Sequence, residues 1–332
     1  ELWVDGLRPS QWEHVFASVQ SLNVDRLKEM DRSHFDVLII DEFHHASAKS
    51  YSQVLEHFNP AELLGLTATP ERSDGADILG YFDNRIAAEL RLWDAIEAGY
   101  LSPFSYYGIS DGTDLRNIGW TRGKGYDVDA LDNLYTANDI WASMVFKEFL
   151  KHIDDPEVVR SLGFCVSVKH AKFMAAFFTK HGIAALSVDG NTPADERRRA
   201  IQKLKDGDIR AIFSVDVFNE GVDVPAVDAI LMLRPSDSPV LFLQQLGRGL
   251  RKHQSKSICT VLDFVGQHRK EFRFDRRLGA LLGESRQGLI QQVEEGFPYL
   301  PAGCQVQLDR VVSGIVLENL RNALPTKWAQ RV

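Results

Sequence analysis

The chain has 332 residues and a formal net charge of −8 at pH 7, with 44% hydrophobic and 25% charged residues. These are values of a globular protein with two domains and the start of a third. The acidic balance excludes a surface that attracts nucleic acid as a whole, although a local basic cleft can form on an acidic protein.

Cysteines and apolar runs exclude further classes of protein. Cys165, Cys259 and Cys304 are far apart and odd in number, so neither a zinc site with paired cysteines nor a disulfide framework is indicated. No apolar run approaches the roughly 18 residues that span a bilayer. We therefore expect a cytoplasmic protein without a membrane contact. The chain begins at Glu1 in the middle of a pattern, which we interpret as a cut made upstream.

Short apolar runs alternate with amphipathic helical stretches, and this pattern predicts an α/β fold with parallel sheets. Strands are expected at residues 37–40, 63–66, 164–166, 183–188, 211–213, 229–232 and 258–264, and helices include residues 170–181 and 193–206.

Two acids follow the first of these strands. Asp41 and Glu42 come directly after residues 37–40, and ligands of open α/β sheets bind at the carboxyl ends of the strands. Asp41 could hold Mg²⁺, directly or through water, and Glu42 could orient and deprotonate an attacking water. Alternatively, the acids only cap the next turn. His44 lacks the partners of a zinc site, so we interpret it as a polar contact between the acids and neighbouring segments.

Hydroxyl side chains follow the next strand. Thr67 and Thr69 come directly after residues 63–66, about 25 residues beyond the acids. Hydrogen bonds from such side chains can relay the state of a nucleotide to the acid site. The alternative is that they begin a turn, as Ser and Thr often do.

Residues 102–139 differ from the rest because several glycines alternate with aromatic residues. We interpret this stretch as a linker or insertion between a first domain, residues 1–101, and a second, residues 140–267. Residues 268–332 begin a C-terminal extension with a basic patch at Arg269, Lys270, Arg273, Arg276 and Arg277, through which protein partners could bind.

A strand and an acidic turn occupy residues 214–225. Ser214 ends the apolar run, and Gly221 permits a close approach of the backbone. Asp223 could contact a ribose, an arginine or nucleic acid. The alternative is an ordinary acidic loop.

An arginine pair stands in residues 244–251. Gln244 precedes Arg248 and Arg251, and we interpret the segment as the start of a helix in which the two arginines share a face. The planar guanidinium donates two parallel hydrogen bonds to a phosphate. Supplied from a second domain, it stabilises the charge of a γ-phosphate during transfer. The alternative is a solvated basic face.

Taken in order, these segments resemble superfamily 2 helicases of the DEAD/DEAH-box type. The similar segments are residues 16–22 (motif Ib), 41–44 (motif II), 67–69 (motif III), 164–170 (motif IV), 214–225 (motif V) and 244–251 (motif VI). Within the superfamily the chain looks closest to the branch with type III restriction subunits, and its linker and tail look like those of bacterial helicase-like proteins.

This resemblance implies two RecA-like domains, the first truncated at its N-terminus, with ATP and Mg²⁺ between them. Nucleic acid, with DNA favoured over RNA, would cross both domains and be held mainly by its phosphates. The residues implied for this track are Gln20, Ser21, Lys169, His170 and Ser214.

One element of the family pattern is missing. The 332 residues contain no Gly-x-x-x-x-Gly-Lys-Ser/Thr loop for the phosphates. We therefore expect the full-length protein to be an ATP-dependent helicase or translocase and this chain alone to hydrolyse ATP very slowly or not at all. One alternative is a non-enzymatic module that binds nucleic acid or a partner. Another is a nuclease with Asp41 and Glu42 as metal ligands, but it lacks the further acid and lysine expected nearby.

Overall fold

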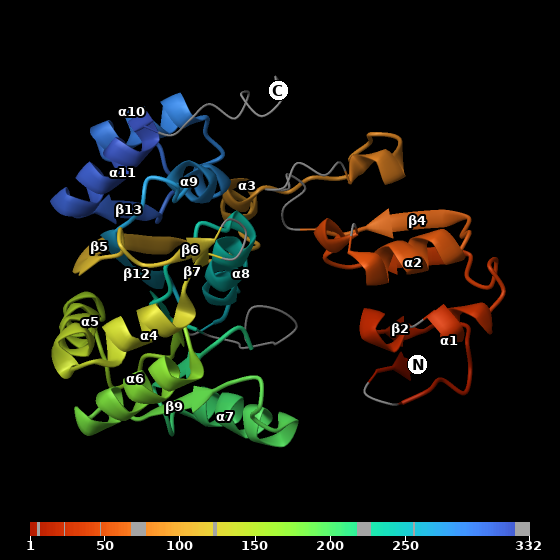
Figure 1. Cartoon of the computed structure of the whole chain (residues 1–332), viewed down its shortest axis with the longest axis horizontal. Helices are drawn as coiled ribbons and strands as arrows, with labels where there is room; N and C mark the ends of the chain where they lie inside the picture. Colours follow the sequence, from red (N-terminus) through yellow and green to blue (C-terminus); the bar gives the residue numbers. More distant parts are fainter. Residues whose placement is uncertain are drawn as a thin grey trace. The chain divides into compact units, whose positions relative to one another are not determined.

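The structure is a computed structural model, and it describes residues 1–4, 7–22, 24–46, 48–67, 78–121, 125–217, 227–254 and 256–322. The chain forms two compact units, Glu1–Glu89 and Leu90–Val332. Parallel strands and helices build both units (Figure 1), which confirms the predicted α/β class.

Unit 1 contains two parallel strand pairs and short helices. β1 (Leu2–Trp3) pairs with β2 (Phe16–Ala17), and β3 (Val37–Ile40) pairs with β4 (Glu62–Gly65). The helical elements are η1 (Val19–Ser21), α1 (Val24–Lys28), η2 (Phe43–His45), α2 (Lys49–His57) and η3 (Leu79–Phe82).

The sheet of β3 and β4 is covered unevenly. Ile40 is buried in a cluster with Phe43, while Val37, Ile39 and Leu64 are 54%, 59% and 41% exposed. Strands of parallel sheets are normally buried on both faces, which is why they are apolar throughout. Part of the apolar sequence of β3 is therefore left exposed by the core of unit 1.

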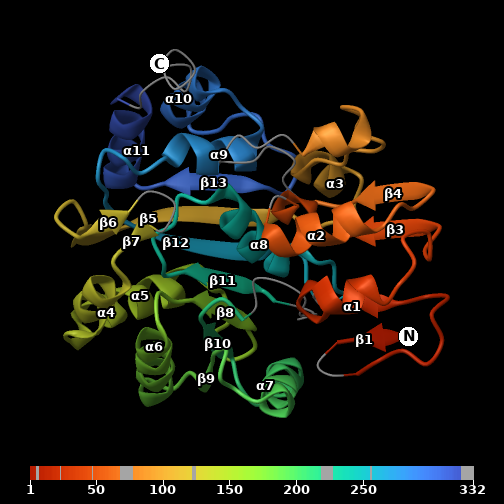
Figure 2. The same ribbon diagram turned by 45° about the vertical axis from the view of Figure 1, so that its right-hand side comes forward.

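Unit 2 is organised around a sheet of seven parallel strands in the order β13-β5-β12-β11-β8-β10-β9. Figure 2 shows these strands from β13 at the top to β9 at the bottom. Their bounds are β5 (Phe104–Asp114), β8 (Ser161–Phe164), β9 (Ala185–Val188), β10 (Ala211–Ser214), β11 (Ala229–Met232), β12 (Cys259–Gln267) and β13 (Gln305–Leu308). β6 (Trp120–Thr121) and β7 (Gly125–Tyr126) form a separate antiparallel pair.

Nine helices of the described part of unit 2 flank this sheet. They are α3 (Leu92–Glu97), α4 (Val128–Thr136), α5 (Asp139–His152), α6 (Val168–Lys180), α7 (Ala194–Asp206), α8 (Pro239–Leu250), α9 (Phe274–Leu282), α10 (Arg286–Glu295) and α11 (Arg310–Asn322). Side-chain caps fix several starts, as expected for Ser and Asn at these positions. Ser167 Oγ accepts a hydrogen bond from His170 N at 2.9 Å, and Ser238 Oγ accepts one from Leu241 N at 3.3 Å.

The structure corrects the predicted domain boundaries. Residues 102–139 are not a linker, because β5 lies inside the sheet of unit 2 between β12 and β13. Phe104 and Tyr106 of β5 are buried in the main core. Residues 268–322 are not a separate domain either, since β13 extends this sheet and α9 packs against α8. The two units divide at residue 89 rather than at residue 101.

Candidate functional site

The acid pair stands where β3 ends. Asp41 is exposed, and its Oδ1 accepts a hydrogen bond of 2.9 Å from the backbone N–H of Glu42. Glu42 has left-handed backbone angles, φ 51° and ψ 46°, which cost a residue with a Cβ roughly 1–2 kcal/mol. Backbone strain of this kind persists where surrounding structure enforces it, and it is common at functional sites.

His44 connects the acid segment to the segment after β4. Its Nδ1 lies 3.2 Å from Glu42 Oε2 and 3.1 Å from Thr67 Oγ1. The His44 side chain is only 7% exposed, and the Glu42 side chain is 27% exposed. Nδ1 thus lies within contact distance of a carboxylate and a hydroxyl from two neighbouring strand ends, and as one ring nitrogen it either donates or accepts a hydrogen bond. These three residues form the Glu42/His44/Thr67 contact.

Backbone bonds and close packing hold this contact in place. Phe43 N donates to Leu66 O at 2.8 Å, and Leu66 N donates to Ile40 O at 2.9 Å. A Cβ on Gly65 would lie 2.6 Å from Phe82 Cζ and 2.8 Å from the Phe43 ring. Glycine at this position therefore lets β4 pass close to Phe43 and fixes where Thr67 emerges.

Several predicted residues of the coupling set lie outside the described residues. These are Thr69, Gly221 and Asp223, and the side chain of Gln20 is likewise not described. Ser21 is described, and its Oγ lies 2.8 Å from Ser18 Oγ in unit 1.

The arginine pair stands at the end of α8, not at the start of a helix as predicted. Arg248 lies in the last turn, where a cation interacts favourably with the helix dipole. Arg251 follows the helix with extended angles, φ −61° and ψ 133°, and pairs with Leu101 in an isolated antiparallel bridge. The prediction that Arg248 and Arg251 share a helix face is therefore wrong, because Arg251 lies outside the helix. Gln244 is half-buried in the middle of α8.

The C-terminal half of α8 is fixed by three contacts. A Cβ on Gly249 would lie 2.7 Å from Ile230 Cδ1 and closer still to Cys259 Sγ, so only glycine permits this approach to the sheet. Lys256 Nζ donates to Gly249 O at 2.5 Å. Ser102 N donates to Leu250 O at 2.7 Å. These contacts set the position at which Arg248 and Arg251 leave the helix.

His170 is corrected as a nucleic-acid contact, because its side chain is completely buried. Its ring stacks on Tyr135 at a centroid distance of 5.2 Å, and its Nδ1 accepts a hydrogen bond of 3.4 Å from Val166 N. Burial lowers the pKa of His170 to about 3. Ser214 is also completely buried, at the end of β10. In this structure neither side chain reaches the surface.

Lys169 remains accessible. Its side chain is 62% exposed, and its Nζ lies 3.1 Å from Asp132 Oδ2. Asp132 is 8% exposed and also accepts a short hydrogen bond from Ser167 Oγ. The sequence did not single out Asp132, because nothing in its local pattern marks it as the partner of a residue in α6.

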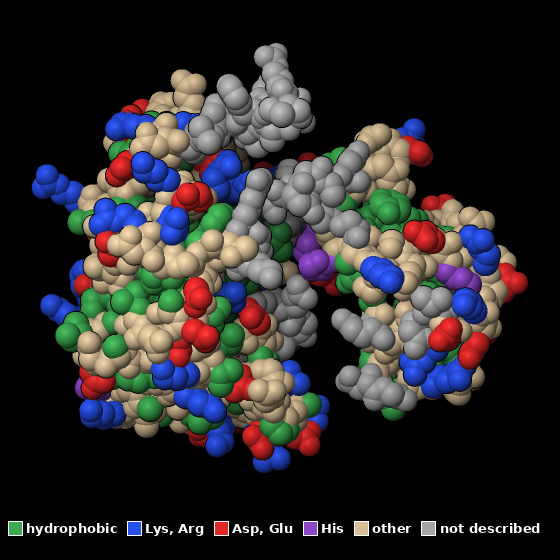
Figure 3. All heavy atoms as spheres, in the orientation of Figure 1, with side chains coloured by type: hydrophobic (Ala, Val, Ile, Leu, Met, Phe, Trp, Pro, Cys, Tyr) green, Lys and Arg blue, Asp and Glu red, His purple; other side chains and the backbone are tan. Residues whose placement is uncertain are grey.

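Charge is mixed on the visible face of unit 2 (Figure 3). On the face that Figure 3 shows, Lys and Arg lie scattered among Asp and Glu. The described residues hold no group of three or more His, Cys, Asp or Glu that could bind a metal ion together. Across the described helices, none combines the length and the apolar character needed to cross a membrane.

Comparisons with known proteins identify the family. The type III restriction enzyme res-subunit family matches residues 3–72, and the helicase conserved C-terminal domain matches residues 144–253. The Saccharomyces cerevisiae protein IRC3, which carries an ATP-dependent helicase name, is 31% identical over 258 residues, 76% of this chain and 37% of that protein. The DNA 3'-5' translocase XPB2 of Sulfurisphaera tokodaii is 26% identical over 274 residues, 73% of this chain and 61% of that protein.

A solved structure shows the same fold. It is a fragment of an HsdR subunit of a type I restriction enzyme from Vibrio vulnificus, with a TM-score of 0.61 and 24% identity, over 80% of this chain and 49% of that one. The chain thus covers 37% and 61% of the two curated relatives. With the two family matches in this order, the chain belongs to the superfamily 2 helicases, in the branch with type III restriction subunits.

Proposed function

We propose that the whole protein is an ATP-dependent translocase or helicase in which Glu42 orients and deprotonates the water that attacks ATP. The observation that carries this proposal is the Glu42/His44/Thr67 contact, with His44 Nδ1 at 3.2 Å from Glu42 Oε2 and 3.1 Å from Thr67 Oγ1. A binding module needs no such link between an acid and a neighbouring strand end. The link suits an acid whose position must respond to the nucleotide.

Asp41 is the proposed ligand of Mg²⁺, directly or through water. Its exposed carboxylate at the end of β3 fits this hard cation, which takes oxygen ligands. When bound, the ion neutralises charge on the phosphates of ATP. Arg248 and Arg251 are the proposed partners of the γ-phosphate. His44, Thr67, Thr69, Gln244, Gly221 and Asp223 are the proposed coupling residues.

DNA is the proposed track. The relative XPB2 is named as a DNA translocase, and the mixed surface charge favours a local binding path over general attraction. Lys169 is the proposed phosphate contact of unit 2, since its side chain is exposed and carries a positive charge. Gln20 and Ser21 are proposed to bind the backbone of nucleic acid from unit 1.

The phosphate-binding loop is proposed to come from residues of the whole protein outside this sequence, because the 332 residues contain none. The uncovered apolar face at Val37, Ile39 and Leu64 supports this proposal, since further elements of a parallel sheet would bury it. The 332-residue chain alone is then expected to show little turnover of ATP.

Phosphate release by the full-length gene product, with and without DNA, tests this function beside Glu42→Gln. Replacing the general base is expected to lower DNA-stimulated turnover by about 10²–10⁴-fold. Glu56→Gln is the matched control, because Glu56 is an exposed glutamate of α2 in the same unit, and it should retain turnover. A wild type without turnover on any nucleic acid would favour the non-enzymatic module, and robust turnover by the 332-residue chain would contradict its expected inactivity.

A further inference from the structure

A buried charged cluster joins three elements of unit 2. Arg277 of α9 is 4% exposed, and Asp263 of β12 and Tyr106 of β5 are each 2% exposed. Arg277 forms a short ion pair with Asp263 Oδ2, and its Nη2 donates to Tyr106 Oη at 3.2 Å. Tyr106 Oη also donates to Asp263 in a short hydrogen bond. The C-terminal segment is thereby bonded to the centre of the sheet.

The same guanidinium supports the helix that carries Arg248. Arg277 Cζ lies 4.4 Å from the centroid of the Phe242 ring, in the first half of α8. Phe242 is 3% exposed and also meets Tyr106 edge-on, with ring centroids 6.3 Å apart. The first half of α8 therefore packs on the buried cluster through Phe242, while the close contact at Gly249 fixes the second half on the sheet.

A buried ion pair is energetically unfavourable if its two residues serve only to fill the core. Burying an ion pair removes two charges from water, and apolar residues of similar volume often stabilise a core equally well. A hydrogen-bonded pair, however, fixes one geometry of the guanidinium, and a cation prefers the face of an aromatic ring. The fixed guanidinium of Arg277 therefore restricts how α8 can lie on the sheet more than an apolar side chain would.

We propose that Arg277 is a positioning residue, which holds α8 through Phe242 and so places Arg248 for its role in ATP hydrolysis. The inference rests on the proposed function and extends it to a segment outside the helicase family matches, which end at residue 253. The C-terminal segment then contributes to the ATPase by supporting the arginine helix.

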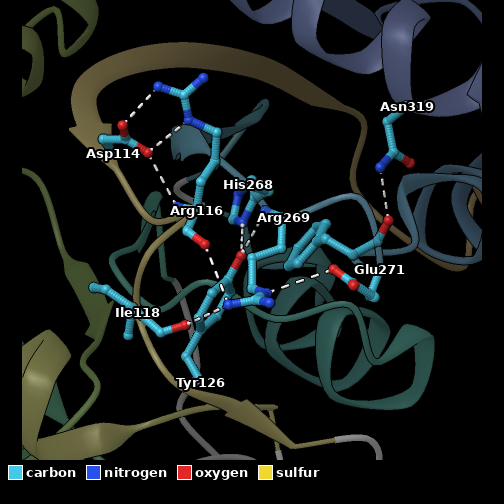
Figure 4. Close-up of polar contacts among 9 residues, drawn as sticks. Asp114, Arg116, Ile118, Tyr126, His268, Arg269, Glu271 and Asn319 are labelled. Carbon is cyan, nitrogen blue, oxygen red and sulfur yellow. Dashed lines mark hydrogen bonds and ion pairs between the residues drawn. The ribbon is translucent and has the colours of Figure 1, made fainter.

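A second arginine of the same segment offers a matched control. Arg269 Nη1 donates to the carbonyl oxygens of Arg116 and Ile118, both at 3.2 Å, and its backbone N–H donates to Tyr126 Oη at 3.1 Å (Figure 4). Its Nε lies 3.5 Å from Glu271 Oε2. Among the described contacts of its side chain, none is with α8. Arg269 therefore anchors the same segment without touching the arginine helix.

The test compares Phe242→Leu, Arg277→Lys and the pair Arg277→Met with Asp263→Asn against Arg269→Met, all in the full-length gene product. Phe242→Leu keeps the ion pair and removes the ring. The paired substitution removes both buried charges, so no unpaired carboxylate prevents folding. Two measurements are made on each variant: amide hydrogen exchange of α8, and kcat and KM for ATP with DNA.

Phe242→Leu and the paired substitution are expected to speed exchange in α8 and to lower kcat roughly ten- to hundredfold, the scale of a small misplacement of a catalytic group. KM for ATP should stay within about twofold, since the arginine acts in the transition state. Arg277→Lys should fall between these variants and the wild type, and Arg269→Met should leave both readouts unchanged.

Unchanged exchange in α8, or a loss of kcat equal to that of Arg269→Met, would overturn the inference. A wild type that shows no turnover contradicts the proposed function instead. In that case the exchange measurement still decides whether Arg277 holds α8 in place, because it does not depend on hydrolysis.

Discussion

Two histidines of unit 2, the buried His170 and the half-buried His268, make its stability depend on pH. Burial lowers the pKa of both His170 and His268 to about 3. The His268 ring stacks on Phe272 at a centroid distance of 3.7 Å, and its Nδ1 lies 3.1 Å from Tyr126 Oη. The folded chain therefore favours the neutral form of both rings.

We expect unfolding to become easier as the pH falls from 6.5, the pKa of an unperturbed histidine. The folded pKa is the lower one, so the unfolded chain binds more protons in this range. Stability is complete above 6.5 and decreases progressively towards pH 3. Each histidine contributes a slope of about 1.4 kcal/mol per pH unit between these values. Urea unfolding at pH 7, 6 and 5 measures this slope.

His170→Asn provides the comparison, because an amide oxygen can still accept the hydrogen bond from Val166 N. The variant should lower the slope of the unfolding free energy by about 1.4 kcal/mol per pH unit, the contribution of one proton. An unaltered slope would show that His170 binds its proton equally well in the folded and unfolded chain.

At the scale of an element, α8 depends on one of its two glycines. A Cβ on Gly249 would meet Ile230 Cδ1 at 2.7 Å, whereas a Cβ on Gly247 would meet nothing within 4 Å. Gly249→Ala is expected to destabilise unit 2 by about 1–3 kcal/mol, the usual effect of overpacking a core. Gly247→Ala should stabilise it by up to about 1 kcal/mol, because alanine favours a helix. Urea unfolding of both variants at pH 7 tests this, and equal effects would contradict the packing argument.

The elements that could be predicted are those with continuous apolar sequences. β3, β10 and β11 lie where the apolar runs were, since strands of a parallel sheet are apolar throughout. β5 was interpreted as part of a linker because residues 102–139 hold several glycines among aromatic residues, Gly108 of β5 included. A Cβ on Gly108 would lie 2.5 Å from Leu308 Cδ2, so this glycine serves the close approach of β13 and not a turn.

Contacts between distant segments set the limits of prediction for the site. The sequence predicted that His44 links the acids to a neighbouring segment, and the order of the segments placed Thr67 near them. It could not show that α8 ends before Arg251, because that end depends on a hydrogen bond from Ser102, 148 residues before Leu250 in the chain, with an N to O distance of 2.7 Å. Nor could it separate the buried Arg277 from its neighbours in the basic patch, since burial follows from the position of Asp263.

At the scale of the whole molecule, unit 2 depends on segments on both sides of its helicase match. β5 and β13 come from residues before and after the matched residues 144–253, and they are neighbours in the sheet. Asp263 of β12 accepts a hydrogen bond from Tyr106 of the preceding segment and pairs with Arg277 of the following one. The folding unit is therefore longer at both ends than the region of family resemblance.

A fragment of residues 90–332 is accordingly expected to unfold in one cooperative urea transition, whereas residues 140–267, the domain predicted from the sequence, should show none. The shorter fragment lacks both partners of Asp263, and an unpaired buried charge costs about 3–5 kcal/mol. It also exposes the side of β12 that β5 covers. These losses compare with a total stability of about 5–15 kcal/mol for a typical domain. Asp263→Asn in residues 140–267 separates the two effects, because it removes the charge and leaves the strand edge exposed. A cooperative transition in this variant alone would assign the defect to the charge, and one in both short fragments would show that the C-terminal segment is not needed for folding.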